Sequence, residues 1–260
     1  MTWFTLLVGR RELLVRQRAR LVVVALVALV VAVVAGCVPT NFTRSPADKT
    51  ARSLPVIVLG GFEFSCNQLA GDWDPWINAI RADRAGVSVE HFRFDPCAPV
   101  EAAASRLGQR VQELLAITGA PAVQVIAHSQ GSLVARWCIR FGTCGGRVDT
   151  LVGLAAANHG TIWANVCPLA FWAVAGCSAM TPDGPFQRAI NADDETWGTT
   201  RYVTASSWCD LTVVPSTSAV LEGAQNHTLT RCVGHTEWKT DPAAIAWGVQ
   251  TLAGERLALS

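Results

Sequence analysis

Two hydrophobic patterns alternate along the chain after residue 54. Short apolar runs are typical of strands buried on both faces of a sheet, and longer segments with apolar residues every three or four positions are typical of helices. The short runs predict strands at 55–59, 87–94, 122–127, 148–156, 201–206 and 227–233. Helical spacing follows the second and third runs and returns at 242–252. This alternation indicates an α/β fold, with a mainly parallel sheet covered by helices on both faces.

The first 54 residues follow a different pattern. Arginines precede an unbroken apolar run at 21–35, which is the order of an export signal, and the run is shorter than the ~20 residues needed to span a bilayer. It ends in VAGC, which resembles the lipobox of bacterial lipoproteins, where the chain is cut before a cysteine that then carries lipid. An uncut signal anchor is the alternative. We expect a signal segment at 1–36, a lipidated Cys37 with a flexible tether over 37–54, and a folded domain at 55–260.

The charge balance argues against nucleic acid as a partner. The formal net charge is +1, from 21 Lys and Arg against 20 Asp and Glu. Five arginines and one glutamate lie in the first 36 residues, so the rest has 16 basic residues against 19 acidic ones. A mildly acidic body without a basic cluster is atypical of nucleic-acid-binding proteins.

Cysteine is abundant, with nine in the chain. The eight besides Cys37 form an even set, which in an exported chain predicts four disulfides. No C-x-x-C pair occurs, so we expect neither a zinc site nor a redox site, and no cofactor. Because short loops close easily, the hypothesis is nearest-neighbour pairing: Cys66–Cys97, Cys138–Cys144, Cys167–Cys177 and Cys209–Cys232.

A candidate nucleophile follows the third predicted strand, in the stretch VQVIAHSQGSLVARW. Ser129 lies between this strand and a predicted helix, as a nucleophile elbow requires, and the small Ala127 and Gly131 allow the sharp turn. The alternative is an ordinary loop or capping serine.

A serine nucleophile needs a base, and in hydrolases of this type the acid and then the histidine follow the serine along the chain. His227 and His235 meet that order. His235 is favoured because it follows a predicted strand, at the sheet edge expected for Ser129, whereas His227 begins that strand.

For the acid, Asp210 follows the strand at 201–206, at the same edge of the sheet. Asp193 and Asp194 lie in a polar segment before it and are interpreted as solvated loop residues. The oxyanion hole needs two amide donors, and we expect the backbone N–H groups of Gln130 and of Phe62. An ordinary tight turn is the alternative interpretation of the glycine pair before Phe62.

Five motifs together resemble the secreted microbial triacylglycerol lipases of the α/β-hydrolase fold, both the small bacterial type and the fungal lipase-B type. They are PVIVLGGF, IAHSQGSLVARW, ANHGT, CDLTVVP and VGH, and the likeness runs from about Pro55 to the C-terminus. The resemblance implies the α/β-hydrolase fold. It matches Ser129, Asp210 and His235 to the triad, and Phe62 and Gln130 to the oxyanion positions.

The chain departs from these relatives at two positions. Gly60 stands where many of them have His or Pro, and Ser132 replaces a common Gly. His159, in the motif NHGT, is the competing histidine, but it precedes the acid and the resemblance assigns it a structural role.

An insertion of roughly 40 residues separates NHGT from the strand before the acid, and it contains the apolar stretch IWANVCPLAFWAVAGC. In the related enzymes such insertions line the acyl pocket or form a partial lid, so we expect Trp163, Phe171 and Trp172 to line the substrate pocket. Core packing is the alternative.

The expected activity is hydrolysis of a lipid or other carboxylic ester through an acyl-enzyme. Transfer of the acyl group to a cell-envelope alcohol, or a non-catalytic binding role, are the alternatives. The expected partners are the ester substrate and the membrane, reached through the lipid anchor, and the protein is expected to be an exported monomer.

Overall fold

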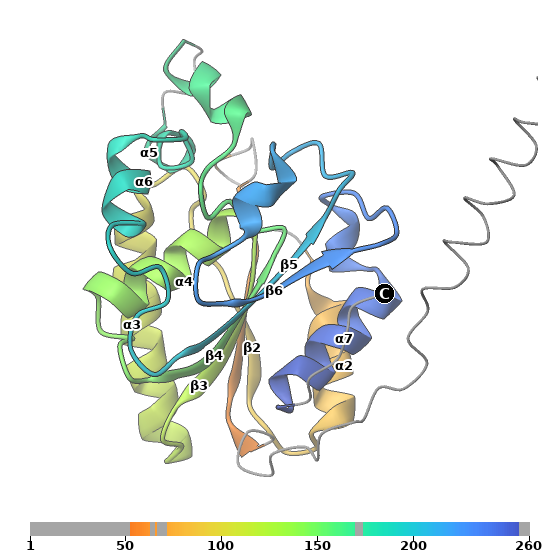
Figure 1. The fold of residues 1–260 in the computed structure, drawn as a ribbon. Helices are drawn as coiled ribbons and strands as arrows, with labels where there is room; N and C mark the ends of the chain where they lie inside the picture. The colour runs from red at the N-terminus through yellow and green to blue at the C-terminus, as the bar shows by residue number, and fades with distance from the viewer. Residues whose placement is uncertain (1–52, 63–65, 67–71, 170–173, 255–260) are drawn as a thin grey trace, which may run out of the picture. The chain divides into compact units, whose positions relative to one another are not determined.

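The described chain is built on a parallel sheet of six strands, in the order β2-β1-β3-β4-β5-β6 (Figure 1). The computed structural model describes residues 53–62, 66, 72–169 and 174–254. All six strands fall within the runs predicted from the hydrophobic pattern or overlap them. Their bounds are β1 Val56–Leu59, β2 Val89–Phe92, β3 Val123–His128, β4 Val148–Leu154, β5 Arg201–Ser207 and β6 Gln225–Leu229.

The last strand begins and ends earlier than the sequence predicts. The apolar pattern predicts a strand over 227–233, but β6 ends at Leu229. Beyond it the chain leaves the ladder, and the Val233 N–H donates instead to the side-chain oxygen of Ser207, at 3.0 Å. His227 therefore lies within the strand and does not begin it.

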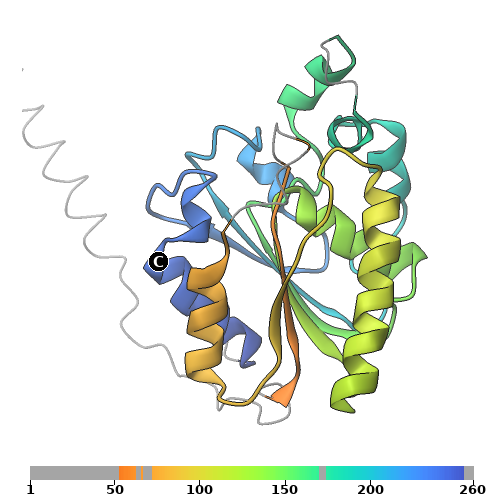
Figure 2. The same ribbon diagram turned by 180° about the vertical axis from the view of Figure 1, so that it is seen from behind.

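Helices cover both faces of the sheet, with α3 and α4 on one side and α2 and α7 on the other (Figures 1 and 2). The hydrophobic pattern does not predict α2, because this helix buries only three residues. The helices are α2 Asp74–Asp83, α3 Val100–Thr118, α4 Gln130–Phe141, α5 Ala175–Ser178, α6 Pro185–Ile190 and α7 Pro242–Leu252. The described ranges also contain the 3₁₀ helices η2 Ile162–Leu169, η3 Ser216–Ala219 and η4 Glu237–Lys239.

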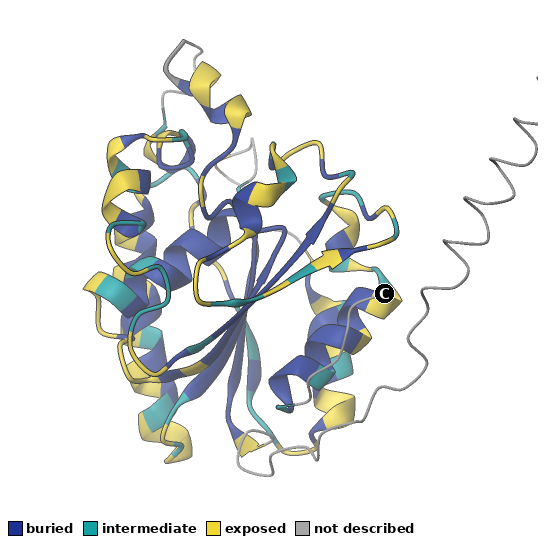
Figure 3. Ribbon diagram, in the orientation of Figure 1, coloured by how far each residue is buried: buried dark blue, intermediate teal, exposed yellow. Residues whose placement is uncertain are grey.

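Two hydrophobic clusters lie on opposite faces of the sheet. Successive side chains of a strand point to opposite faces. In β1 this sends Ile57 and Leu59 into the cluster beneath α3 and α4, and Val56 and Val58 into the cluster beneath α2 and α7. Figure 3 shows that the central strands and the inward faces of the helices are buried, whereas the edge strand β6 is largely exposed. The sheet is therefore a rigid base for the loops at its carboxyl edge.

Four disulfides join the cysteines in the predicted nearest-neighbour pairs: Cys66–Cys97, Cys138–Cys144, Cys167–Cys177 and Cys209–Cys232. The predicted signal segment, Cys37 and most of the tether lie outside the described residues, as do Phe171 and Trp172. Within the described ranges, no helix is long and apolar enough to cross a membrane.

Candidate active site

Ser129 lies on a sharp turn between β3 and α4, with φ 55° and ψ −127°. A non-glycine residue rarely adopts a positive φ, and such strain is typical of functional turns. The turn needs glycine two positions later, because a Cβ on Gly131 would overlap the carbonyl oxygen of Gly60. The strand–turn–helix context predicted for Ser129 is thus present in the structure.

Ser129, His235 and Asp210 form a continuous chain of polar contacts. The His235 Nε2 atom lies 3.0 Å from Ser129 Oγ, and His235 Nδ1 lies 2.7 Å from Asp210 Oδ2. A carboxylate accepts only, so Nδ1 carries the hydrogen and Nε2 is left to accept the serine proton. Since Ser129 and Asp210 are both 4% exposed, this arrangement is largely shielded from water.

The carboxylate of Asp210 is fixed by its own loop. Its Oδ1 atom accepts hydrogen bonds from the backbone N–H groups of Thr212, at 2.8 Å, and Val213, at 2.9 Å. Oδ2 therefore remains for His235, and the carboxylate cannot rotate without losing one of these bonds.

A second link holds the same loop from the other side. The Thr161 hydroxyl donates to the Thr212 carbonyl at 2.7 Å and accepts from the Val214 N–H at 3.1 Å. The Trp163 indole N–H donates to the Leu211 carbonyl at 2.8 Å. The motif NHGT and the start of the insertion therefore support the acid loop.

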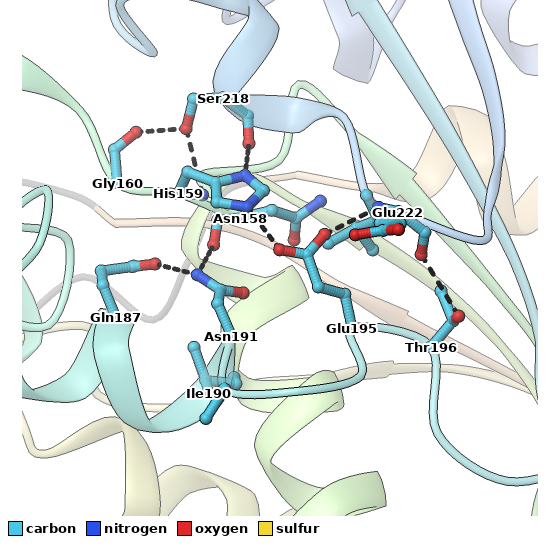
Figure 4. A network of polar contacts seen from close by, with 12 residues as sticks. Asn158, His159, Gly160, Gln187, Ile190, Asn191, Glu195, Thr196, Ser218 and Glu222 are labelled. Atoms are coloured by element: carbon cyan, nitrogen blue, oxygen red, sulfur yellow. Dashed lines mark hydrogen bonds and ion pairs between the residues drawn. The ribbon is translucent and has the colours of Figure 1, made fainter.

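His159 makes contacts of its own, apart from Ser129 (Figure 4). Its Nε2 atom lies 2.7 Å from Glu195 Oε1 and its Nδ1 atom lies 3.2 Å from the Ser218 carbonyl. Glu195 also accepts from the Glu222 N–H, at 2.7 Å. This network joins the turn after β4 to the segments before and after β5.

His227 and the acidic pair Asp193 and Asp194 make their contacts away from Ser129. The ring of His227 packs edge-on against Trp247, at 5.3 Å between centroids, and burial lowers the pKa of His227. Asp194 accepts from the Thr196 N–H at 2.8 Å, within its own loop, and Asp193 has φ 63° in the same loop. None of these three residues joins the contact chain of Ser129, His235 and Asp210.

The loop after β1 passes directly against the elbow. A Cβ on Gly61 would lie 2.6 Å from Ser129 Cβ and 3.1 Å from Ser129 Oγ. Phe62 follows in this loop, and Gln130 is the first residue of α4. The side-chain amide of Gln130 donates to the carbonyls of Pro96 and Gly176, at 3.1 and 2.8 Å. Both residues predicted to supply oxyanion donors thus lie near Ser129: Gln130 follows it in the chain, and Phe62 lines the same cavity.

A cavity of about 240 Å³ opens at Ser129 and His235. Apolar side chains predominate in its wall, and the predicted pocket residue Trp163 is among them. Sequence reasoning missed most of the others, because the apolar insertion signals only part of the wall and Thr161, Thr212 and Val213 lie outside it. The lining residues are Phe62, Ser129, Thr161, Trp163, Ala164, Val166, Cys167, Cys177, Met180, Thr212, Val213 and His235.

No metal site is evident in the part of the chain that the structure describes, where no three His, Cys, Asp or Glu residues form a group able to hold an ion.

The sequence model of the class 2 lipases matches residues 105–248, which is more than half of the chain. The chain belongs to the class 2 lipase family. The family and the four disulfides together indicate an extracellular protein. No curated protein sequence matches this lipase significantly.

Solved structures similar to this lipase share the predicted α/β-hydrolase fold. Lipase B of Aspergillus fumigatus has a TM-score of 0.63 and 19% identity, over 83% of this chain and 55% of the fungal one. The mature lipase BlEst2 of Bacillus licheniformis has a TM-score of 0.61 and 13% identity, over 80% of this chain and 93% of its own. Phospholipase PlaB of Legionella pneumophila has a TM-score of 0.56 and 14% identity, over 77% of this chain and 59% of the phospholipase. This lipase therefore spans little more than half of the fungal relative.

Proposed function

We propose that this class 2 lipase hydrolyses lipid esters through a covalent acyl-enzyme on Ser129. The observation that carries the proposal is the contact chain from Ser129 Oγ through His235 to Asp210, at 3.0 and 2.7 Å, at the mouth of an apolar cavity. A serine, a base and an orienting acid in this order are the parts that acyl transfer needs.

In the first step Ser129 Oγ attacks the ester carbonyl carbon while His235 Nε2 takes the hydroxyl proton. Asp210 holds the imidazole and stabilises the imidazolium that forms. The N–H groups of Phe62 and Gln130 stabilise the oxyanion, and one such donor is typically worth about 3–4 kcal/mol of the barrier. The intermediate then collapses, and His235 gives the proton to the departing alcohol.

In the second step water attacks the acyl-enzyme and His235 accepts its proton. The carboxylic acid leaves, and the proton returns to Ser129 Oγ. These steps require only groups of this chain, the ester and water.

The apolar surroundings of the cavity favour a lipid substrate. Four large apolar residues near its mouth are exposed: Ile162 (47%), Trp163 (56%), Val166 (53%) and Leu211 (79%). A cluster of exposed apolar side chains is costly in water and favours contact with apolar partners. We infer that the acyl chain enters the cavity beside Trp163 and Val166, which both line it.

Labelling and turnover test this proposal. The full chain, made under oxidising conditions, is incubated with a fluorophosphonate probe and with p-nitrophenyl esters of short, medium and long acyl chains. Ser129→Ala should lose both labelling and turnover, whereas Ser105→Ala, on the exposed face of α3, should keep both. Labelling that persists in Ser129→Ala would contradict the assignment. Products analysed with an added alcohol separate hydrolysis, which releases free acid, from acyl transfer.

We also propose that Cys37 carries a lipid that anchors the enzyme to the membrane, on the basis of the VAGC sequence. Cys37→Ser should then leave the protein without bound fatty acid in intact-mass spectrometry. The same mass for both proteins, apart from the substitution, would argue for the uncut signal anchor.

A further inference from the structure

His128 immediately precedes Ser129 and contacts the main chain of His235, the predicted base. It ends β3 and is 3% exposed. Its Nε2 atom lies 2.9 Å from the backbone carbonyl oxygen of His235. Its ring lies between two others, with centroids 4.5 Å from the His235 ring and 5.4 Å from the Trp73 ring. The catalytic loop is thus contacted from the neighbouring strand.

The direction of this hydrogen bond follows from its partner. A carbonyl oxygen accepts only, so His128 Nε2 carries the hydrogen and donates it. Burial lowers the pKa of His128 well below its ordinary value, and the adjacent His235 lowers it further. The imidazole is therefore neutral, with Nε2 protonated and Nδ1 bare.

The other ring nitrogen has no such contact. Nδ1 is buried and, among the described residues, has no hydrogen-bond partner. It faces the loop after β1, since a Cβ on Gly61 would lie 3.3 Å from it. An unpartnered buried acceptor costs free energy that an apolar ring would avoid. The hydrogen bond from Nε2 to the His235 carbonyl is therefore the contact that gives a histidine an advantage over an apolar ring at position 128.

We propose that His128 is a positioning residue for catalysis, whose Nε2–H bond to the His235 carbonyl fixes the backbone of the base. The inference rests on the proposed function of the triad. Asp210 orients the His235 ring through Nδ1, but a ring bond alone leaves its main chain free to shift within its loop. The second bond, made to the main chain, fixes the point from which the ring reaches Ser129 Oγ at 3.0 Å. Displacements of about 1 Å at such a contact are costly to rate.

The neutral state of His128 suits this position. During the reaction His235 becomes an imidazolium, and a second positive charge 4.5 Å away would oppose it. Besides His235, the charge of Lys239 also lowers the pKa of His128. Because His128 stays neutral, it donates the hydrogen bond without that repulsion.

Two substitutions separate the hydrogen bond from the packing. His128→Phe keeps a ring between Trp73 and His235 but removes the donor, and His128→Gln keeps an N–H donor near the position of Nε2. We expect His128→Phe to lower kcat roughly 3- to 10-fold, which corresponds to the loss of one neutral hydrogen bond. KM should stay within about twofold, since the described residues that line the cavity do not include His128. His128→Gln should recover most of the lost kcat.

The rates are measured on the full chain with a p-nitrophenyl ester and are normalised to fluorophosphonate-titrated sites. A wild-type kcat in His128→Phe, or an equal loss of kcat in both variants, would overturn the inference. The protonation site gives a second test that needs no variant. Nitrogen-15 NMR of the His128 ring should show Nε2 protonated and Nδ1 bare over about pH 5 to 8. A hydrogen on Nδ1 would refute the proposed bond. Ser129→Ala tests the triad separately, so the inference can fail while the proposed function stands.

Discussion

Gly61 offers a direct test of how closely the loop after β1, which carries the proposed oxyanion donor Phe62, approaches Ser129. In Gly61→Ala the new methyl group would lie 2.6 Å from Ser129 Cβ, whereas ordinary contacts begin at 3.4 Å. Either the loop or the elbow must then move by at least 0.4 Å to bring this contact to 3.0 Å, and by 0.8 Å to bring it to the ordinary 3.4 Å. Ser129 is held by β3 and α4, so we expect the loop to move and to carry the Phe62 N–H with it.

The expected loss is large because a donor is moved away from the developing charge. A displacement of about 1 Å costs roughly 100-fold in rate, and removal of one oxyanion donor costs about 100- to 1,000-fold in kcat. We therefore expect kcat for a p-nitrophenyl ester to fall by about two orders of magnitude in Gly61→Ala, with a smaller change in KM. The thermal unfolding temperature should change little, because the variant disturbs the edge of the sheet and leaves both hydrophobic clusters intact.

Gly248→Ala is the matched control. Gly248 lies in α7, and a Cβ there would overlap the buried ring of Trp76. Overpacking of this kind typically costs about 1–3 kcal/mol of stability, so the unfolding temperature should fall while kcat per titrated site stays unchanged. If Gly61→Ala keeps kcat within about threefold of the wild type, the loop does not supply an oxyanion donor of the usual worth.

Three further outcomes follow from the geometry. Asp210→Asn should lower kcat about 10,000-fold with little change in KM, because an amide favours the wrong tautomer of the base; steady-state kinetics with an unchanged unfolding temperature checks this. Trp163→Ala should raise KM several-fold for long esters and less for short ones, and should also lower kcat because its bond to the Leu211 carbonyl is lost, whereas Trp208→Ala, exposed and outside the cavity lining, should do neither. An equal rise of KM for long and short esters in Trp163→Ala would exclude a wall role for Trp163. Burial, and after it the charge of Arg93, lowers the pKa of His91 from 6.5 to about 4. Between these two pH values the His91 side chain is protonated in the unfolded chain but not in the folded one. The free energy of unfolding therefore falls as the pH drops through that window. His91→Gln should flatten this fall in thermal unfolding between pH 7 and 5, and an unchanged slope would refute it.

The sequence predicts the sheet well because a buried parallel strand leaves a continuous apolar run. The strands β1, β3 and β4 are buried at nearly every position, and their runs are evident. The edge strand β6 alternates between partly exposed and exposed residues, so its predicted bounds are wrong by several positions. The helix α2 escapes prediction because its interior mixes three buried side chains with acidic and basic ones.

The candidate triad can also be predicted from the sequence, because the parallel sheet brings its three residues to the same edge. Each of its residues follows a strand, and parallel strands end at one edge of the sheet. The cavity wall is not accessible in this way. Val166 and Met180 are ordinary apolar residues whose place depends on how the insertion folds over the edge, and Val213 is an ordinary apolar residue of the acid loop. His128 carries no signal either, because its contact with His235 joins positions that are distant in sequence.

The loops that carry the candidate triad are held by separate links, so the geometry of the triad does not depend on every residue of the cavity wall. Asp210 is bound by its own backbone, and that backbone is bound by Thr161. The Cys209–Cys232 disulfide ties the acid loop to the chain just before His235. Trp163, in contrast, both lines the cavity and bonds to the Leu211 carbonyl. Changes deeper in the wall can therefore alter the pocket alone, whereas changes at Trp163 alter the pocket and the support of the acid together.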